Sequence, residues 1–116
     1  MVKYFTGEEY HDKRLVQINS TILAIINNEY PHFYQETDYC SYSPDGIPLK
    51  DPNLFRPACF VHDFLYRYGH LYKERLPALQ TREVVDELLR DNIYDLASRS
   101  VGESLARTIS NFYFAA

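Results

Sequence analysis

The chain has 116 residues, of which 46% are hydrophobic and 24% charged, which suffices for one compact domain with its own core and is too short for two. Its 12 basic and 16 acidic side chains give a net charge of −4, which argues against a nucleic-acid binder, because such proteins carry a basic excess. The longest apolar run, residues 22–26, is far below the ~20 residues of a transmembrane helix. Without a polybasic surface, any membrane contact would depend on apolar side chains or a metal.

The first predicted helix begins at residues 6–9, Thr-Gly-Glu-Glu, where a hydroxyl is followed three positions later by a carboxylate, as in a capping box. Apolar residues then recur at steps of three and four, which predicts one buried face. The helix is expected to end near residues 27–28, before Pro31. Its buried face comprises Leu15, Ile18, Ile22, Ile25 and Ile26.

Residues 36–57 are predicted to form an ordered loop, because their prolines are incompatible with regular structure. A loop of roughly twenty residues in a small domain usually has a function. Helical periodicity resumes at Pro57, a favourable first-turn residue, and continues to Gly69, a natural stop.

Two more helices are predicted in the C-terminal half, after a connector over residues 70–80. One begins at Thr81 and is broken over residues 98–102. The last begins at Glu103, and its inward-facing residues are expected to be Leu105, Ile109, Phe112 and Tyr113. Because no segment shows a strand pattern, the predicted fold class is all-α.

Chemically versatile residues are concentrated in the helix that follows Pro57. Cys59, His62, Asp63 and Tyr66 are separated by three and four positions, so they share one side of this helix. A half-buried His beside an Asp is unfavourable unless each has a partner. For an arbitrary His-Asp pair, a hydrogen-bonded core histidine with a solvated neighbour is the common explanation.

The two cysteines of the chain, Cys40 and Cys59, permit one disulfide. Such a bond would pin the loop against the helix near His62 and, by closing about twenty residues, would contribute roughly 3 kcal/mol. A loop pinned there would offer backbone carbonyls and the Asp38 carboxylate toward Asp63. Oxygen ligands of this kind suit calcium.

A series of short motifs runs from Thr37 to Arg67 and, with the following helix, covers about half the chain. The motifs are Asp38-Tyr39-Cys40, Ser43-Pro44-Asp45, Phe55, Ala58-Cys59, His62-Asp63-Phe64 and Tyr66-Arg67. This series resembles the secreted phospholipases A₂, specifically their small prokaryotic and fungal branch. The resemblance implies a single phospholipase A₂-like helical domain over residues 1–116, with two antiparallel catalytic helices and a calcium-binding loop.

The resemblance also implies a catalytic pair. His62 would be the general base that takes a proton from the attacking water, and Asp86 of the next helix would hold its second ring nitrogen. Tyr66 would steady Asp86 through its hydroxyl. Asp91 and Asp95 lie on the same predicted helix, but Asp95 is ~14 Å further along and cannot replace Asp86 without a shift of the whole helix.

A calcium site is implied as well. Its expected ligands are the side chains of Asp63 and Asp38 and the carbonyl of Tyr39, while Cys40 and Cys59 would form the disulfide. Calcium would polarise the ester carbonyl and stabilise the oxyanion.

The implied activity is that of a calcium-dependent phospholipase A₂, which hydrolyses the sn-2 acyl ester of glycerophospholipids to a fatty acid and a lysophospholipid. The expected partner is a phospholipid membrane or micelle interface and no nucleic acid, with an inhibitor or immunity protein as a further candidate, and the chain is expected to be a monomer. A disulfide and a calcium requirement suit a secreted or extracellular protein whose leader is absent from this chain; a toxin domain delivered by a larger protein is the alternative. Loop residues expected to contact lipid are Tyr39, Tyr42, Leu49, Leu54 and Phe55.

Two departures from the family pattern and two alternatives remain open. The loop between Asp45 and Phe55 is longer than usual in that branch, and the cysteines of a second, C-terminal disulfide are missing. One alternative is a non-catalytic phospholipase-like scaffold that binds a membrane or a protein. The other is a metal phosphohydrolase in which His32 joins the His62-Asp63 pair as an additional ligand.

Overall fold

The computed structural model describes residues 5–38 and 54–115, and the side chains up to residue 112. Within these ranges the chain is helical and contains no strand, which confirms the prediction of an all-α fold. The elements are α1 (Lys13–Glu29), α2 (Phe33–Glu36), α3 (Arg56–Tyr68), the 3₁₀ helices η1 (Gly69–Tyr72) and η2 (Pro77–Leu79), α4 (Arg82–Val101) and α5 (Glu103–Ala115).

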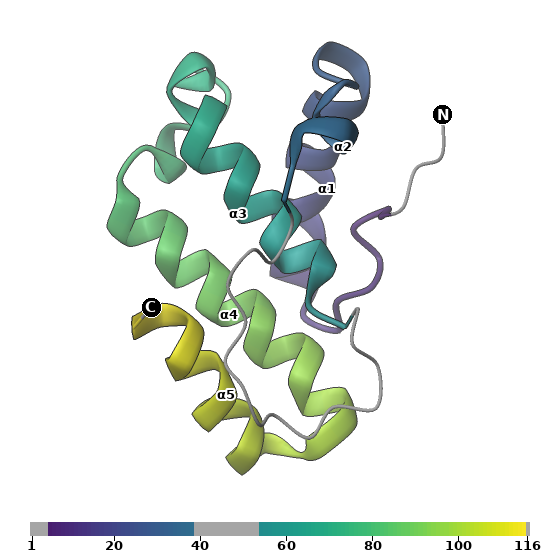
Figure 1. Ribbon diagram of the computed structural model, residues 1–116, viewed down its shortest axis with the longest axis vertical. Helices are drawn as coiled ribbons and strands as arrows, with labels where there is room; N and C mark the ends of the chain where they lie inside the picture. The colour runs from purple at the N-terminus through teal and green to yellow at the C-terminus, as the bar shows by residue number, and fades with distance from the viewer. Residues whose placement is uncertain (1–4, 39–53, 116) are drawn as a thin grey trace.

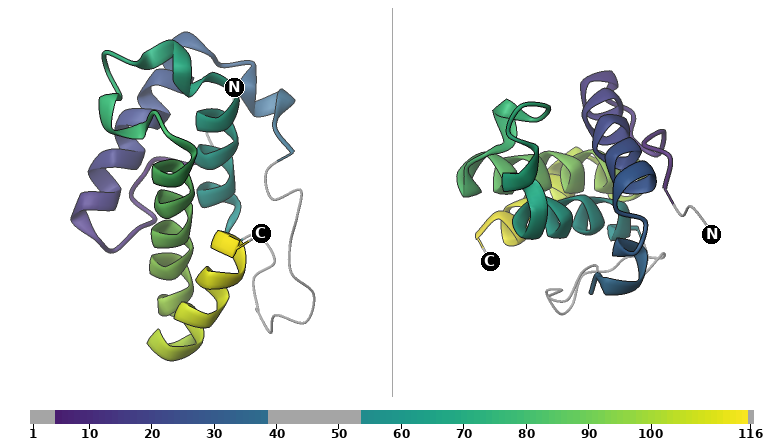
Figure 2. Two further views of the ribbon diagram at one scale, coloured as in Figure 1. Left: turned by 90° about the vertical axis from the view of Figure 1, so that its left-hand side faces the viewer. Right: turned by 90° about the horizontal axis from the view of Figure 1, so that it is seen from above.

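Helices α3 and α4 lie side by side and run antiparallel, joined by the two 3₁₀ helices (Figures 1 and 2). Helix α5 folds back along α4 after a turn at Gly102. The backbone of Gly102 has φ +82°, a conformation that L side chains rarely adopt, and a Cβ atom there would meet nothing within 4 Å. Backbone strain, rather than space, therefore favours glycine at this turn.

The observed start of α1 corrects the predicted one. The Thr-Gly-Glu-Glu segment is a turn, in which the Glu9 carboxylate accepts hydrogen bonds from the backbone N–H groups of Thr6 and Gly7. Gly7 has φ +90°, which is incompatible with a right-handed helix, so no helix runs through this point. A Cβ atom there would lie 2.3 Å from the hydroxyl oxygen of Ser20, so the position requires glycine. The helix begins instead after Asp12, whose carboxylate caps the N–H groups of Arg14 and Leu15.

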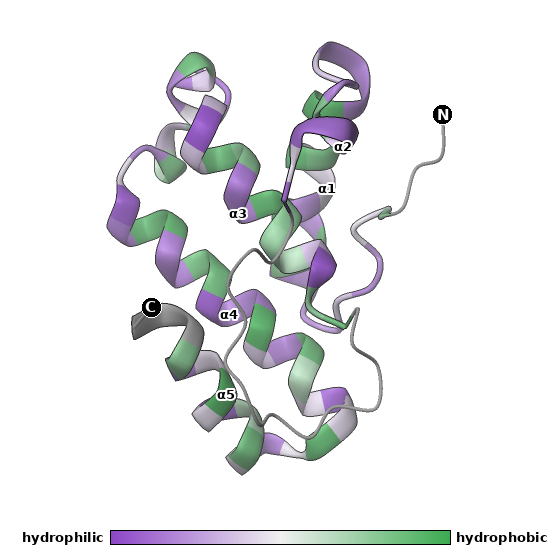
Figure 3. Ribbon diagram, viewed as in Figure 1, coloured by the Kyte–Doolittle hydropathy of each residue, from purple (hydrophilic) through white to green (hydrophobic). Residues whose placement is uncertain are grey.

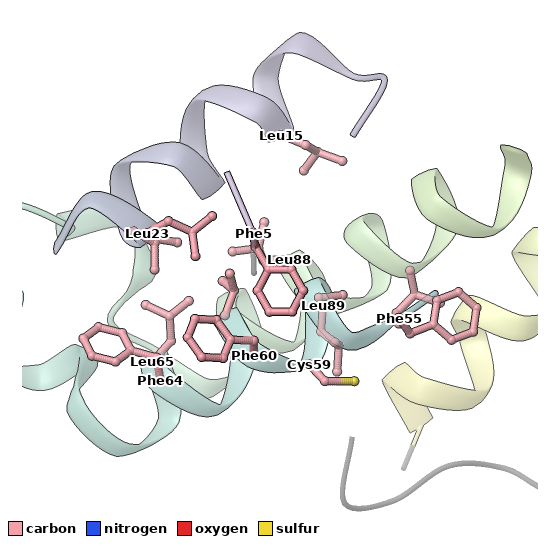
Figure 4. Close-up of a cluster of buried hydrophobic side chains, with 14 of the residues drawn as sticks. Phe5, Leu15, Leu23, Phe55, Cys59, Phe60, Phe64, Leu65, Leu88 and Leu89 are labelled. Atoms are coloured by element: carbon pink, nitrogen blue, oxygen red, sulfur yellow. The ribbon is translucent and has the colours of Figure 1, made fainter. Parts of the chain in front are cut away.

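The core is one cluster of buried side chains from all five α-helices and η2. Phe60 and Phe64 of α3 are fully buried, and Phe33 of α2 contacts both rings at centroid distances of 5.1 and 5.2 Å. Figure 4 shows Phe5 beside Phe60, with ring centroids 5.3 Å apart, and Leu88 of α4 close to them. Hydrophilic and hydrophobic residues alternate in short blocks along α3 and α4 (Figure 3). Each helix therefore has a hydrophobic face for the core and a hydrophilic face for polar contacts.

The predicted boundaries of α3 and the predicted start of α4 agree with the structure, but α4 continues through residues 98–101, where a break was predicted, and the predicted inner face of α5 is partly wrong. Helix α3 ends at Tyr68 and α4 is capped by the Thr81 hydroxyl. In α5, Ile109 is buried, but Leu105 and Phe112 are 39% and 56% exposed, and the side chain of Tyr113 lies outside the described residues. The small residues Ala106 and Ser110 are buried instead, because α5 packs closely along α4 through a narrow face.

Loop residues at the start of α3 also differ from expectation. Phe55 was expected to contact lipid but is 4% exposed and belongs to the core, and Leu54 packs against the same cluster. Tyr39, Tyr42 and Leu49 lie outside the described residues. Among the helices of the described part of the chain, none combines the length and the apolarity needed to cross a membrane.

Two buried asparagines join α1 to α4. The side chains of Asn19 and Asn92 are both 0% exposed, and each amide donates a hydrogen bond to the other's carbonyl oxygen, at 3.0 and 3.2 Å. Because both amides are removed from water, each depends on its partner for its hydrogen bonds.

We expect Asn92→Ala to lower the free energy of unfolding by about 2 kcal/mol, because it leaves the buried Asn19 amide without its partner. Urea denaturation measures the change, and Asn28→Ala, at an exposed position of α1, should alter it by less than about 0.5 kcal/mol. The double variant Asn19→Ala/Asn92→Ala should be more stable than the sum of the single effects predicts. Additive effects would contradict the direct coupling of the two amides.

Candidate active site

A histidine and a carboxylate face each other across the α3–α4 pair. The Nε2 atom of His62 lies 2.8 Å from Oδ1 of Asp86, and the two side chains are 21% and 31% exposed. Among the described residues, the other ring nitrogen of His62, Nδ1, has no hydrogen-bond partner. A neutral imidazole that donates Nε2–H to Asp86 presents an unprotonated Nδ1, which is the form required of a general base.

Tyr66, one helical turn after His62, completes this cluster. Its hydroxyl donates a 2.5 Å hydrogen bond to the same Asp86 oxygen, and its ring lies over the imidazole with centroids 4.2 Å apart. The guanidinium of Arg82, at the start of α4, lies 5.2 Å from the centre of the Tyr66 ring. Desolvation, followed by the hydrogen bond and the charge of Asp86, raises the pKa of Tyr66, so the hydroxyl remains a proton donor at neutral pH.

The other acidic residues of α4 bind elsewhere. Asp95 accepts hydrogen bonds from the backbone N–H groups of His11 and Asp12, at 2.7 and 3.2 Å, and so holds the segment before α1. Asp91 forms an ion pair with Arg14 of α1. The structure therefore brings Asp86, and neither of its two neighbours, to His62.

Asp63, the residue after His62, has two partners of its own. Its Oδ2 atom accepts a 2.6 Å hydrogen bond from the hydroxyl of Thr37, and its Oδ1 atom accepts a 2.9 Å hydrogen bond from Nε of Arg67. The same guanidinium lies 3.6 Å from the carboxylate of Asp38. Two carboxylates thus lie beside one cationic group, and the Thr37 hydroxyl binds the outer oxygen of one of them.

The carboxylates of Asp63 and Asp38 offer hard oxygen atoms of the kind that calcium prefers, beside a position that already holds positive charge. Within the described ranges, no three His, Cys, Asp or Glu side chains form a metal-binding group, and the loop that carries Tyr39 lies outside them. Cys59 is disulfide-bonded, and Cys40, the other cysteine of the sequence, lies outside the described residues.

Three polar residues of this region had no role assigned from the sequence. Arg67 and Thr37 bind Asp63, and Arg82 packs on Tyr66. The i, i+4 spacing of Asp63 and Arg67 was a usable signal, because such pairs meet on a helix surface. Thr37 and Arg82 gave no such signal, since their contacts join segments far apart in the sequence.

No family model, curated protein or solved structure matches the chain. The class of protein that the fold and the site define is a small all-α protein with a His–Asp–Tyr cluster between two antiparallel helices.

The contact with Asp86 predicts the tautomer of His62. We expect the neutral imidazole to carry its proton on Nε2, because the Asp86 carboxylate can only accept. Long-range ¹H–¹⁵N spectra distinguish the two tautomers, with exposed His11 as an internal reference. Asp86→Ala should replace the single tautomer by a mixture, and a proton found on Nδ1 in the unaltered protein would contradict the assigned geometry.

Proposed function

We propose that the chain is a calcium-dependent phospholipase A₂ that hydrolyses the sn-2 acyl ester of glycerophospholipids. The observation that carries the proposal is the 2.8 Å contact of His62 Nε2 with Asp86, which leaves Nδ1 without a partner among the described residues. The antiparallel α3–α4 pair and the motifs of residues 37–67 support a phospholipase A₂-like fold as part of the same proposal.

In this proposal His62 acts as a general base through Nδ1. It accepts a proton from a water molecule while the water oxygen attacks the carbonyl carbon of the ester. The resulting imidazolium is stabilised by Asp86, which also fixes the ring orientation. Collapse of the tetrahedral intermediate breaks the ester C–O bond, and the proton returns from Nδ1 to the departing alkoxide of the lysophospholipid.

Tyr66 and Arg82 act through Asp86 rather than on the substrate. The Tyr66 hydroxyl shares Oδ1 of Asp86 with the imidazole, so it limits the rotation of that carboxylate. Arg82 packs on the Tyr66 ring and brings a positive charge toward the same cluster. Both are therefore positioning residues.

Asp63 and Asp38 would hold the calcium ion, together with the carbonyl of Tyr39 that the motif implies. When bound, the ion would supply Lewis-acid stabilisation to the carbonyl oxygen as it becomes negative. Thr37 would orient Asp63 through its hydrogen bond to Oδ2.

We infer the compartment and the partners of the protein from the same features. The substrate is presented by a membrane or micelle, and the disulfide-bonded Cys59 suits a secreted protein or a toxin domain exposed to an oxidising medium. An inhibitor or immunity protein would then be a natural partner, and the chain would act as a monomer.

Fatty-acid release from mixed phospholipid vesicles tests the proposal directly. Release should require calcium, stop with a chelator and yield the lysophospholipid that has lost its sn-2 chain. His62→Ala should lower the rate about 10²–10⁴-fold, because it removes the general base. His11→Ala, at an exposed position outside the cluster, is the matched control and should retain the parental rate.

Asp63→Asn should abolish the calcium-dependent release of fatty acid, because the neutral asparagine amide lacks the negative charge that binds calcium. A parental rate of fatty-acid release in either His62→Ala or Asp63→Asn would contradict the mechanism. Calcium-independent vesicle binding without release, from disulfide-bonded protein, would favour the non-catalytic scaffold instead.

The phosphohydrolase alternative depends on His32. The ring of His32 lies at the N-terminus of α2, 6.5 Å from the Tyr30 ring. His32→Ala should leave ester hydrolysis nearly unchanged under our proposal. Loss of a phosphatase activity that requires Mg²⁺ or a transition metal would support the alternative.

A further inference from the structure

We infer that Arg67 occupies the cation position between the proposed calcium ligands Asp63 and Asp38 and competes with calcium, so that it sets the calcium concentration at which the protein becomes active. This inference rests on the proposed function, because it concerns the affinity of the same site. It assigns to Arg67 a regulatory role in ion binding, separate from the acid–base chemistry of His62.

The contacts of Arg67 place its charge at the centre of the acidic group. Its Nε atom donates to Oδ1 of Asp63 at 2.9 Å, and one terminal nitrogen lies 3.6 Å from Oδ2 of Asp38. The other terminal nitrogen lies 3.5 Å from the backbone carbonyl oxygen of Glu36. The guanidinium therefore joins α3 to the segment that follows α2.

Both oxygens of Asp63 are engaged in this arrangement. Oδ1 accepts from Arg67 and Oδ2 accepts from Thr37. A calcium ion that takes both oxygens of one carboxylate would approach the guanidinium closely, and two positive charges at such a distance repel each other. Calcium binding then requires the guanidinium to weaken or leave its contact with Asp63.

Arg67 also has an orienting effect on Asp63, which would act in the opposite direction. Thr37 retains that effect in the absence of Arg67, because its 2.6 Å hydrogen bond reaches the other oxygen. The Asp63 side chain is 19% exposed and its neighbours restrict it further. Loss of the repulsion should therefore outweigh the loss of orientation.

Competition of this kind has a functional consequence. Calcium sites of extracellular modules bind in the range of about 10⁻⁴–10⁻³ M, far more weakly than intracellular sensors. A built-in cation that offsets part of the negative charge of Asp63 and Asp38 would keep the affinity in that weak range. The protein would then remain inactive wherever calcium is scarce and would respond only in a calcium-rich medium.

Calcium titration of the disulfide-bonded full chain by isothermal calorimetry tests the inference without an activity assay. Arg67→Gln should bind calcium about tenfold more tightly than the unaltered protein, a change of about 1.4 kcal/mol. Arg67→Met removes the same charge and should shift the affinity in the same direction. Arg67→Lys keeps the charge but loses the forked contacts of the guanidinium, so it should shift the affinity less than Arg67→Gln or Arg67→Met does.

Arg75→Gln is the matched control, because Arg75 forms an exposed ion pair with Glu29 on a different part of the surface. It should leave the calcium affinity unchanged. Unchanged or weaker binding by Arg67→Gln and Arg67→Met, with normal binding by the unaltered protein, would overturn the inference alone. Failure of the unaltered protein and both variants to bind calcium would overturn the inference and the proposed calcium-dependent function together.

The fatty-acid release assay then distinguishes the proposed role of Arg67 from the proposed phospholipase activity. If the inference holds, the calcium concentration that gives half-maximal fatty-acid release should fall in Arg67→Gln in parallel with the dissociation constant. Tighter calcium binding by Arg67→Gln without any lipid hydrolysis in the unaltered protein would retain the competition and overturn the phospholipase proposal.

Discussion

The burial of one face of α3 determines where the polar residues of this protein lie. Phe60 and Phe64, one turn apart, are fully buried and contact aromatic rings of α2, of the N-terminal segment and of the residues that follow α1 and α3. Because successive helical residues are separated by about 100°, two of the three residues between them, His62 and Asp63, lie on the sides of α3 that are not fully buried, whereas Val61 is itself part of the core. His62 and Asp63 are therefore directed toward α4 and toward the end of α2, where their partners lie.

The position of Asp86 depends on contacts remote from His62. Helix α4 is tied to α1 by the buried pair of Asn19 and Asn92 and to the preceding segment by Asp95, whose carboxylate accepts two backbone hydrogen bonds. These contacts lie one and a half turns or more beyond Asp86 along α4. They fix the position of α4 along its own axis relative to the rest of the core. Asp86 thus lies opposite His62 because these remote contacts align α4 with α3. The 2.8 Å contact between the two side chains adds to this alignment of the helices.

Local sequence signals predicted the helices that are bounded by strong capping or breaking residues. Pro57, Thr81 and Gly102 mark the observed starts and turn of α3, α4 and α5 closely. The start of α1 was wrong because the Thr-Gly-Glu-Glu turn uses the same side-chain hydrogen bonds as a helix cap. The positive φ of Gly7 and its close approach to Ser20 of α1, a tertiary feature, distinguish the turn from a helix start. The exposure of Phe112 was likewise set by tertiary packing, since small residues of α5 face α4.

Within the site, the sequence could indicate which residues share a helix face, but not what each faces. The spacing of His62, Asp63 and Tyr66 follows from helical geometry, whereas the choice of Asp86 over Asp91 and Asp95 came from family resemblance. Arg67 was visible as part of a motif, yet its contact with Asp38 depends on how the chain returns after α2. Long flexible side chains such as arginine reach many partners, so pattern alone does not select one.

The two central carboxylates, Asp86 and Asp63, differ in the partners that the fold gives them, and this difference separates their proposed roles. Asp86 accepts a hydrogen bond from the Tyr66 hydroxyl and faces the His62 imidazole, and neither group brings a permanent charge. Its negative charge is therefore available to stabilise the imidazolium that forms when His62 accepts a proton. Asp63 is already paired with a permanent cation, so its charge is committed unless a stronger cation replaces Arg67. One carboxylate is thus suited to a charge that appears during a reaction, and the other to the exchange of one cation for another.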